Sequence, residues 1–86
     1  SDVYKRQVED LTDLLTWATG VGVIGSEDVD LLLELLAEEN GGLAREEAQR
    51  LVGERHGVAM RTIRRRRDRA AARLRDAAPR YLAEIA

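Results

Sequence analysis

The chain has 86 residues, no cysteine and only three aromatic residues, and its formal net charge is −2. This length allows one domain with a modest core, and the lack of cysteine excludes disulfides and thiolate chemistry. No apolar run approaches the ~20 residues that span a bilayer, so we expect no membrane partner.

The charges are divided unevenly along the chain. Residues 1–43 contain ten acidic and two basic residues, a net charge of −8, whereas residues 44–86 contain twelve arginines and six acidic residues, a net charge of +6. Such a molecule is dipolar, and its basic half indicates a surface that faces a polyanion.

The first seven residues, SDVYKRQ, start without methionine and resemble translated adapter sequence. We expect residues 1–7 to be a non-native or disordered leader, and the chain to be a piece of a longer protein. Residues 8–86 then form a single helical domain. Its first helix is predicted from Val8 to Gly20, because Val8, Leu11 and Leu15 share one helical face.

Gly20, Gly22 and Gly25 spell G-x-G-x-x-G, the pattern of a dinucleotide-binding loop. That loop requires a strand before the glycines and another after the following helix, whereas here a predicted helix precedes them. We therefore expect a tight connector between two helices. Its apolar residues are expected to fill the core: Val21, Val23 and Ile24.

The remaining spacing predicts three more helices. Residues 26–40 are rich in leucine, residues 44–56 place Ala48, Leu51 and Val52 inward, and a fourth helix runs from about 59 to 78. Pro79 either starts a short terminal helix or kinks a continuing one. The expected fold is all-α, a small domain of four to five helices.

Residues 44–78 have the pattern of a helix-turn-helix. Gly53 lies where two helices would cross closely, and Gly57 permits the sharp turn between them. In such a motif the first helix supports the second, which enters the DNA major groove. Apolar positions at the turn and along the second helix form the core of the motif: Val58, Ile63, Ala70 and Leu74.

The stretch RTIRRRRDRAAARLR resembles the end of region 4 in sigma-70-type factors, especially the extracytoplasmic-function group. Residues 23–48, VIGSEDVDLLLELLAEENGGLAREEA, resemble the leading helix and loop of the same domain. The resemblance implies a four-helix module that reads the −35 promoter element and touches the flap of RNA polymerase. The chain departs from the family pattern at His56 and Arg67, and in a supporting helix about one turn longer than usual.

Helical geometry assigns roles on the fourth helix if Ile63 points inward. Residues of the first turns read base edges in such a helix, where arginine grips guanine O6 and N7 with two hydrogen bonds. Other cationic and hydroxyl groups suit phosphates. The expected base-contacting residues are Met60, Arg61, Arg64 and Arg65. The expected phosphate-contacting residues are Arg45, Arg50, Thr62, Arg69 and Arg73.

Arg67 lies about 40° from the direction of Ile63, at the edge of the inner face. Since an unpaired buried arginine is costly, we expect its stem along the core and its head paired with Glu34 or Glu38. His56, the sole histidine, is expected to pack at the turn.

The leading prediction is sequence-specific binding of double-stranded DNA in transcription initiation or its regulation, by a cytoplasmic, nucleoid-associated protein. The main alternative is a protein-interaction module that docks RNA polymerase, an anti-sigma factor or a second copy through the leucine-rich second helix. Two weaker alternatives are an RNA-binding arginine segment at residues 64–67 and a merely solvated basic face. We expect no enzymatic activity, no metal, no cofactor and no small-molecule substrate.

Overall fold

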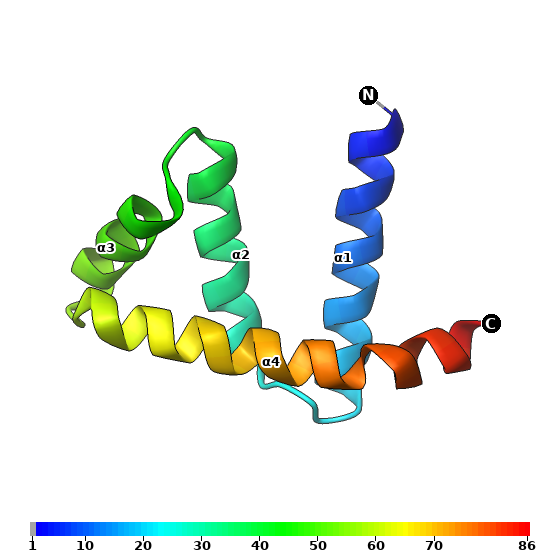
Figure 1. Cartoon of the computed structure of the whole chain (residues 1–86). Helices are drawn as coiled ribbons and strands as arrows, with labels where there is room; N and C mark the ends of the chain where they lie inside the picture. Colours follow the sequence, from blue (N-terminus) through cyan, green and yellow to red (C-terminus); the bar gives the residue numbers. More distant parts are fainter. Residues whose placement is uncertain (1) are drawn as a thin grey trace.

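The computed structural model describes the backbone of residues 2–86 and the side chains of residues 9–86. The described residues form four α-helices and no strand, so the predicted all-α fold class is confirmed. The last helix, α4 (Met60–Ile85), is the longest, and the other three helices pack on one side of it (Figure 1). The helices are α1 (Asp2–Gly20), α2 (Ser26–Asn40), α3 (Arg45–His56) and α4 (Met60–Ile85). None of these helices is both long enough and apolar enough to cross a membrane.

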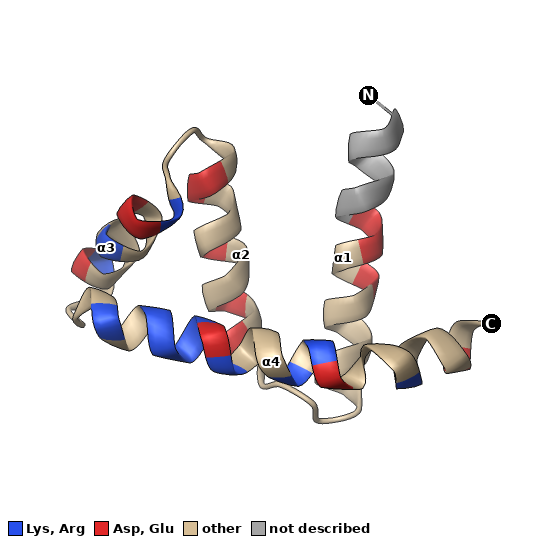
Figure 2. Ribbon diagram, in the orientation of Figure 1, with Lys and Arg blue, Asp and Glu red and all other residues tan. Residues whose placement is uncertain are grey.

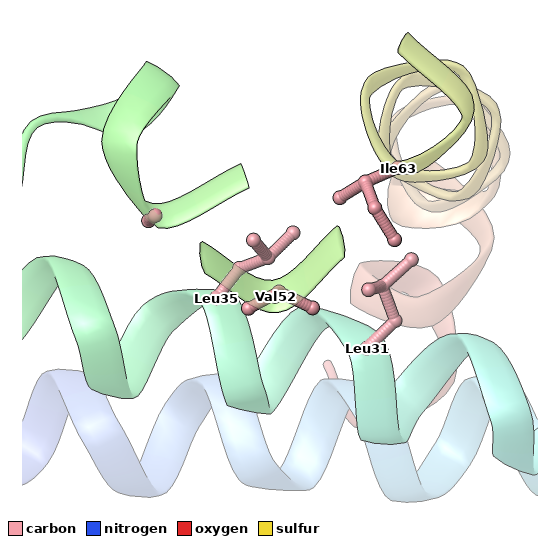
Figure 3. Packing of buried hydrophobic residues seen from close by; sticks show 5 residues of the cluster. Leu31, Leu35, Val52 and Ile63 are labelled. Carbon is pink, nitrogen blue, oxygen red and sulfur yellow. The ribbon is translucent and has the colours of Figure 1, made fainter. Parts of the chain in front are cut away.

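Two groups of buried side chains hold the helices together. The first joins α2, α3 and α4 through Leu31, Leu35, Val52 and Ile63, which converge in Figure 3, together with Ala48. The second joins α1, the α1–α2 connector and α4, and it consists of Leu15, Ala18, Ile24 and Ala70. Helix α4 contributes to both groups, because Ile63 and Ala70 lie two turns apart on one face.

Helix α4 continues through Pro79, which is one of the two alternatives that the sequence leaves open. Pro79 lies inside the helix, which ends at Ile85 instead of near Ala78. Contacts with α1 stabilise the turns around and beyond the proline. The Trp17 and Tyr81 ring centroids are 5.2 Å apart, Arg80 lies over the Trp17 ring, and the Trp17 indole N–H donates to Glu84. These tertiary contacts compensate for the backbone hydrogen bond that a proline cannot donate.

The glycine stretch connects two helices, as predicted. Helix α1 ends at Gly20, and the connector turns at Gly22, whose φ of +81° is a conformation that favours glycine. Ile24 is buried and Val23 is half-buried, but Val21 is 42% exposed. The expectation that Val21 fills the core is therefore wrong.

The prediction that residues 1–7 are a leader concerns residues whose side chains lie outside the described part. It stays a prediction, as does the division of the chain into a leader and one domain.

Candidate nucleic-acid interface

The interface begins at the turn that joins α3 to α4. Gly57 ends α3 in the left-handed conformation, with φ +68° and ψ +29°. The Val58 N–H then donates to the Gly53 carbonyl at 2.9 Å, which satisfies a free carbonyl of the last turn of α3. Glycine adopts this conformation without the steric cost that a side chain adds, as the sequence predicts for Gly57.

Gly53 allows α3 and the turn to approach closely. A Cβ atom on Gly53 would lie 2.7 Å from the Val58 carbonyl oxygen and 3.5 Å from Cγ1 of Ile63. Ile63 itself is fully buried, so it anchors α4 against α3 as predicted. The same sequence pattern also predicts Ala70 and Leu74 correctly: Ala70 is buried, and Leu74 is half-buried against the second group.

Val58 does not fill the core, contrary to prediction. Its side chain is exposed and lines a hollow with His56 and Arg66. The physical reason is the close approach at Gly53. There the backbone carbonyl of Val58, and not its side chain, faces α3.

The first half of α4 presents arginines to solvent. Residues 60–75 contain eight arginines and one aspartate, and Figure 2 shows basic residues along this part of the helix. A shallow open hollow on α4 is lined by Arg61, Arg64, Arg65 and Asp68. Three of the four expected base-contacting residues therefore lie together on one face. The fourth, Met60, is half-buried and does not line this hollow.

Arg64 differs from its neighbours because its guanidinium contacts α3. Its Nε donates to Oε1 of Gln49 at 3.4 Å, and its Nη2 lies 3.4 Å from Oε1 of Glu46. Among residues 9–86, Arg61 and Arg65 have no such ion-pair partner. The hollow thus combines one guanidinium that contacts α3 with two cationic side chains that no carboxylate of residues 9–86 engages.

The expected phosphate-contacting residues are spread over two helices. Arg69 and Arg73 are exposed on α4, while Thr62 is half-buried near its start. On α3, Arg45 lies 3.7 Å from Glu39 and Arg50 lies 2.8 Å from Glu54. Such exposed ion pairs contribute little to stability, so both arginines remain available to a stronger anion.

A polar network joins the end of α3 to α2. Arg55 contacts Glu38 at 2.6 Å and Glu34 at 3.2 Å, and His56 Nε2 lies 2.7 Å from Glu34 Oε1. The hydrogen bond with His56, aided by Arg55, lowers the pKa of Glu34 against the opposing effect of burial. His56 lies at the turn as expected, but it is exposed and makes a polar contact instead of packing.

The expected pairing of Arg67 is wrong. Its stem lies half-buried beside Leu32, Leu36 and Leu74, but its Nη1 contacts the neighbouring Asp68 at 3.1 Å. Glu34 and Glu38 are instead occupied by Arg55 and His56. The end of α3 covers the side of α2 that carries Glu34 and Glu38. Arg67 therefore lies against the side of α2 that carries Leu32 and Leu36.

The burial of Gln49 was not predicted from the sequence. Leu51 is expected to point inward, but it is half-buried, whereas Gln49 is only 3% exposed. Gln49 precedes the buried pair Val52 and Gly53 by three and four positions, the spacing of one helical face. That spacing is the signal that identifies it.

Comparison of this chain with protein-family models, with curated proteins and with solved structures finds no match.

Proposed function

We propose that this chain binds double-stranded DNA in a sequence-specific way, as a sigma-70 region 4-like module acting in transcription initiation or its regulation. In this proposal α3, the turn at residues 57–59 and α4 form a helix-turn-helix, and α4 enters the major groove. The observation that supports it best is the open hollow of Arg61, Arg64 and Arg65 on the exposed side of a helix anchored by Ile63.

The charge of this surface matches a phosphate backbone. Eight arginines against one aspartate within residues 60–75 give a local net charge of +7, and α3 adds the exposed Arg45 and Arg50. Phosphate contacts provide most of the attraction and fix the register, while base edges provide specificity. The proposed division is base reading by the hollow and phosphate contact by Arg45, Arg50, Arg69 and Arg73.

The acidic half of the chain limits how DNA can approach. Helices α1 and α2 carry most of the acidic residues, and they lie together on one side of α4 (Figure 2). A duplex is repelled from the acidic surfaces of α1 and α2 and attracted to the arginines of α3 and α4, so the uneven charge distribution orients the encounter. A protein of this kind would act at the nucleoid in the cytoplasm.

The test is to titrate a fluorescently labelled duplex with the protein at several salt concentrations and to measure binding by fluorescence anisotropy. Each phosphate contact should contribute a slope of about −0.9 to log affinity against log salt, so several contacts give a steep fall. The single variant Arg69→Gln, which removes one proposed phosphate contact, should weaken binding and make the slope less steep by about 0.9. Arg80→Gln, a matched loss of charge beside Trp17, should leave both unchanged. A flat salt response of the unmodified protein contradicts DNA binding.

A second candidate function is docking of a protein partner, which one observation favours. A groove of about 190 Å³ between α1, α2 and α4 is lined mainly by leucines, and Leu33 at its edge is 43% exposed. Purified core RNA polymerase and a second copy of the chain are the partners to test, by sedimentation after nuclease treatment. Leu33→Lys should abolish a complex through this groove and leave the salt-dependent DNA affinity unchanged.

A further inference from the structure

The geometry points to Gln49 as a positioning residue that holds Arg64 in place to read a guanine. The inference rests on the proposed DNA-binding function and assigns within it which arginine gives specificity. Arg64 becomes the specific base reader, while Arg61 and Arg65 act as adaptable cationic contacts.

The first observation is the burial of Gln49. It is the sole polar or charged side chain in the buried class among residues 9–86, with 3% of its surface exposed. Burial of an amide is costly unless its polar atoms are hydrogen-bonded. No buried side-chain nitrogen or oxygen among the described residues lacks a hydrogen-bond partner. Packing in the α3 core face, where the neighbouring Ala48 is also fully buried, therefore restricts the side chain of Gln49, and its Oε1 accepts a hydrogen bond from Arg64.

The second observation is which atom of Arg64 the amide engages. Gln49 Oε1 accepts from Nε, the nitrogen on the side of the guanidinium, at 3.4 Å. A guanidinium carries five N–H donors in a rigid planar fork. With Nε engaged, the two terminal nitrogens, Nη1 and Nη2, remain to approach a base end-on. Guanine presents two neighbouring acceptors in the major groove, O6 and N7, which match that pair of donors.

The third observation concerns the one competing contact. Glu46 Oε1 lies 3.4 Å from Nη2, but the Glu46 side chain is 79% exposed and Arg64 itself is 44% exposed. An ion pair at such a site is weak and is readily exchanged for another partner. DNA can therefore displace Glu46 while the half-buried contact with Gln49 persists. Among residues 9–86, no side chain holds the guanidinium of Arg61 or Arg65 in the way that Gln49 holds that of Arg64.

The experiment first selects bound duplexes from a pool with a randomised centre. Each guanine of the selected duplex is then replaced in turn by 7-deazaguanine, which lacks the N7 acceptor. For the unmodified protein, one replacement should lower affinity by roughly tenfold. Arg64→Lys keeps the charge but lacks the fork, and Gln49→Met keeps the size but lacks a strong acceptor. Both variants should reduce that loss to about twofold or less, whereas Gln49→Glu, which retains an acceptor, should keep most of it.

Two controls separate positioning from folding and from DNA binding itself. Thermal melting followed by circular dichroism verifies that each variant is folded, and the salt dependence of affinity should stay the same in Gln49→Met and Arg64→Lys, which keep the charge of the protein. If Gln49→Met or Arg64→Lys keeps the full loss at that guanine, the inference is overturned while DNA binding stands. If the unmodified protein shows no salt-dependent affinity, the proposed function fails and this inference fails with it.

Discussion

Gly53 and Val58 meet where α3 turns into α4. A Cβ atom on Gly53 would lie 2.7 Å from the Val58 carbonyl oxygen, closer than such atoms can approach. The neighbouring atom is backbone and cannot rotate away, so this contact fixes the distance between the last turns of α3 and the start of α4. The direction in which α4 presents its arginines depends on that distance.

Gly53→Ala should therefore destabilise the protein by about 1–3 kcal/mol, the usual cost of forcing extra volume into a packed site. Urea unfolding followed by circular dichroism measures the change. Gly20→Ala is the matched control, because Gly20 lies in a helix, its φ is not positive, and a Cβ atom at that position would meet nothing within 4 Å. Equal stability of the two variants contradicts the tight crossing.

Glu34→Gln should lower stability near neutral pH and lose that effect in acid. The pKa of Glu34 in the folded protein lies below its ordinary value of 4.5, chiefly because of the hydrogen bond with His56. A depressed carboxyl pKa stabilises the fold above the unfolded pKa, and the contribution disappears as the pH falls through the folded pKa. Unfolding free energies of the two proteins should therefore converge only at a pH below the lowered pKa of folded Glu34. The exposed Glu47→Gln serves as control, and a difference that persists in acid speaks against the network.

Glu46→Gln should strengthen DNA binding. The change removes a negative charge 3.4 Å from Nη2 of Arg64. A phosphate or a base can then bind Arg64 without displacing a carboxylate. Since exposed ion pairs are worth up to about 1 kcal/mol, the gain should be roughly twofold to fivefold at low salt and smaller at high salt. Anisotropy titrations measure it. Glu47→Gln, the same charge change on the same helix, should give a smaller gain, and an equal gain would point to net charge alone.

Tyr81→Ala should loosen the end of α4 from α1. The centroids of the Trp17 and Tyr81 rings are 5.2 Å apart. Such an aromatic pair contributes about 0.5–1.5 kcal/mol to stability beyond the effect of its buried area. Trp17 is the sole tryptophan, so its fluorescence emission should shift to longer wavelength as water reaches the ring. Leu82→Ala removes a side chain that is 59% exposed and should leave the emission unchanged. An unchanged spectrum for Tyr81→Ala refutes the packing of these two rings.

Features that depend on neighbouring residues could be predicted from the order of amino acids. The helical spacing of Ile63 and Ala70, the left-handed turn at Gly57 and the shared face of Arg61 and Arg65 follow from the period of a helix and from backbone sterics. Each requires only residues a few positions away. These local rules give the all-α fold and most of the candidate interface.

Features that depend on distant partners required the folded molecule. Gln49 and Arg64 are 15 residues apart, Arg55 and Glu34 are 21 apart, and the contact of α1 with the end of α4 joins residues 67 apart. Helical period shows which side chains share a face, but not which face of another helix they meet, because the core packs whole helices at once. For that reason only the folded chain shows the partner of Arg67 and decides between the two alternatives at Pro79.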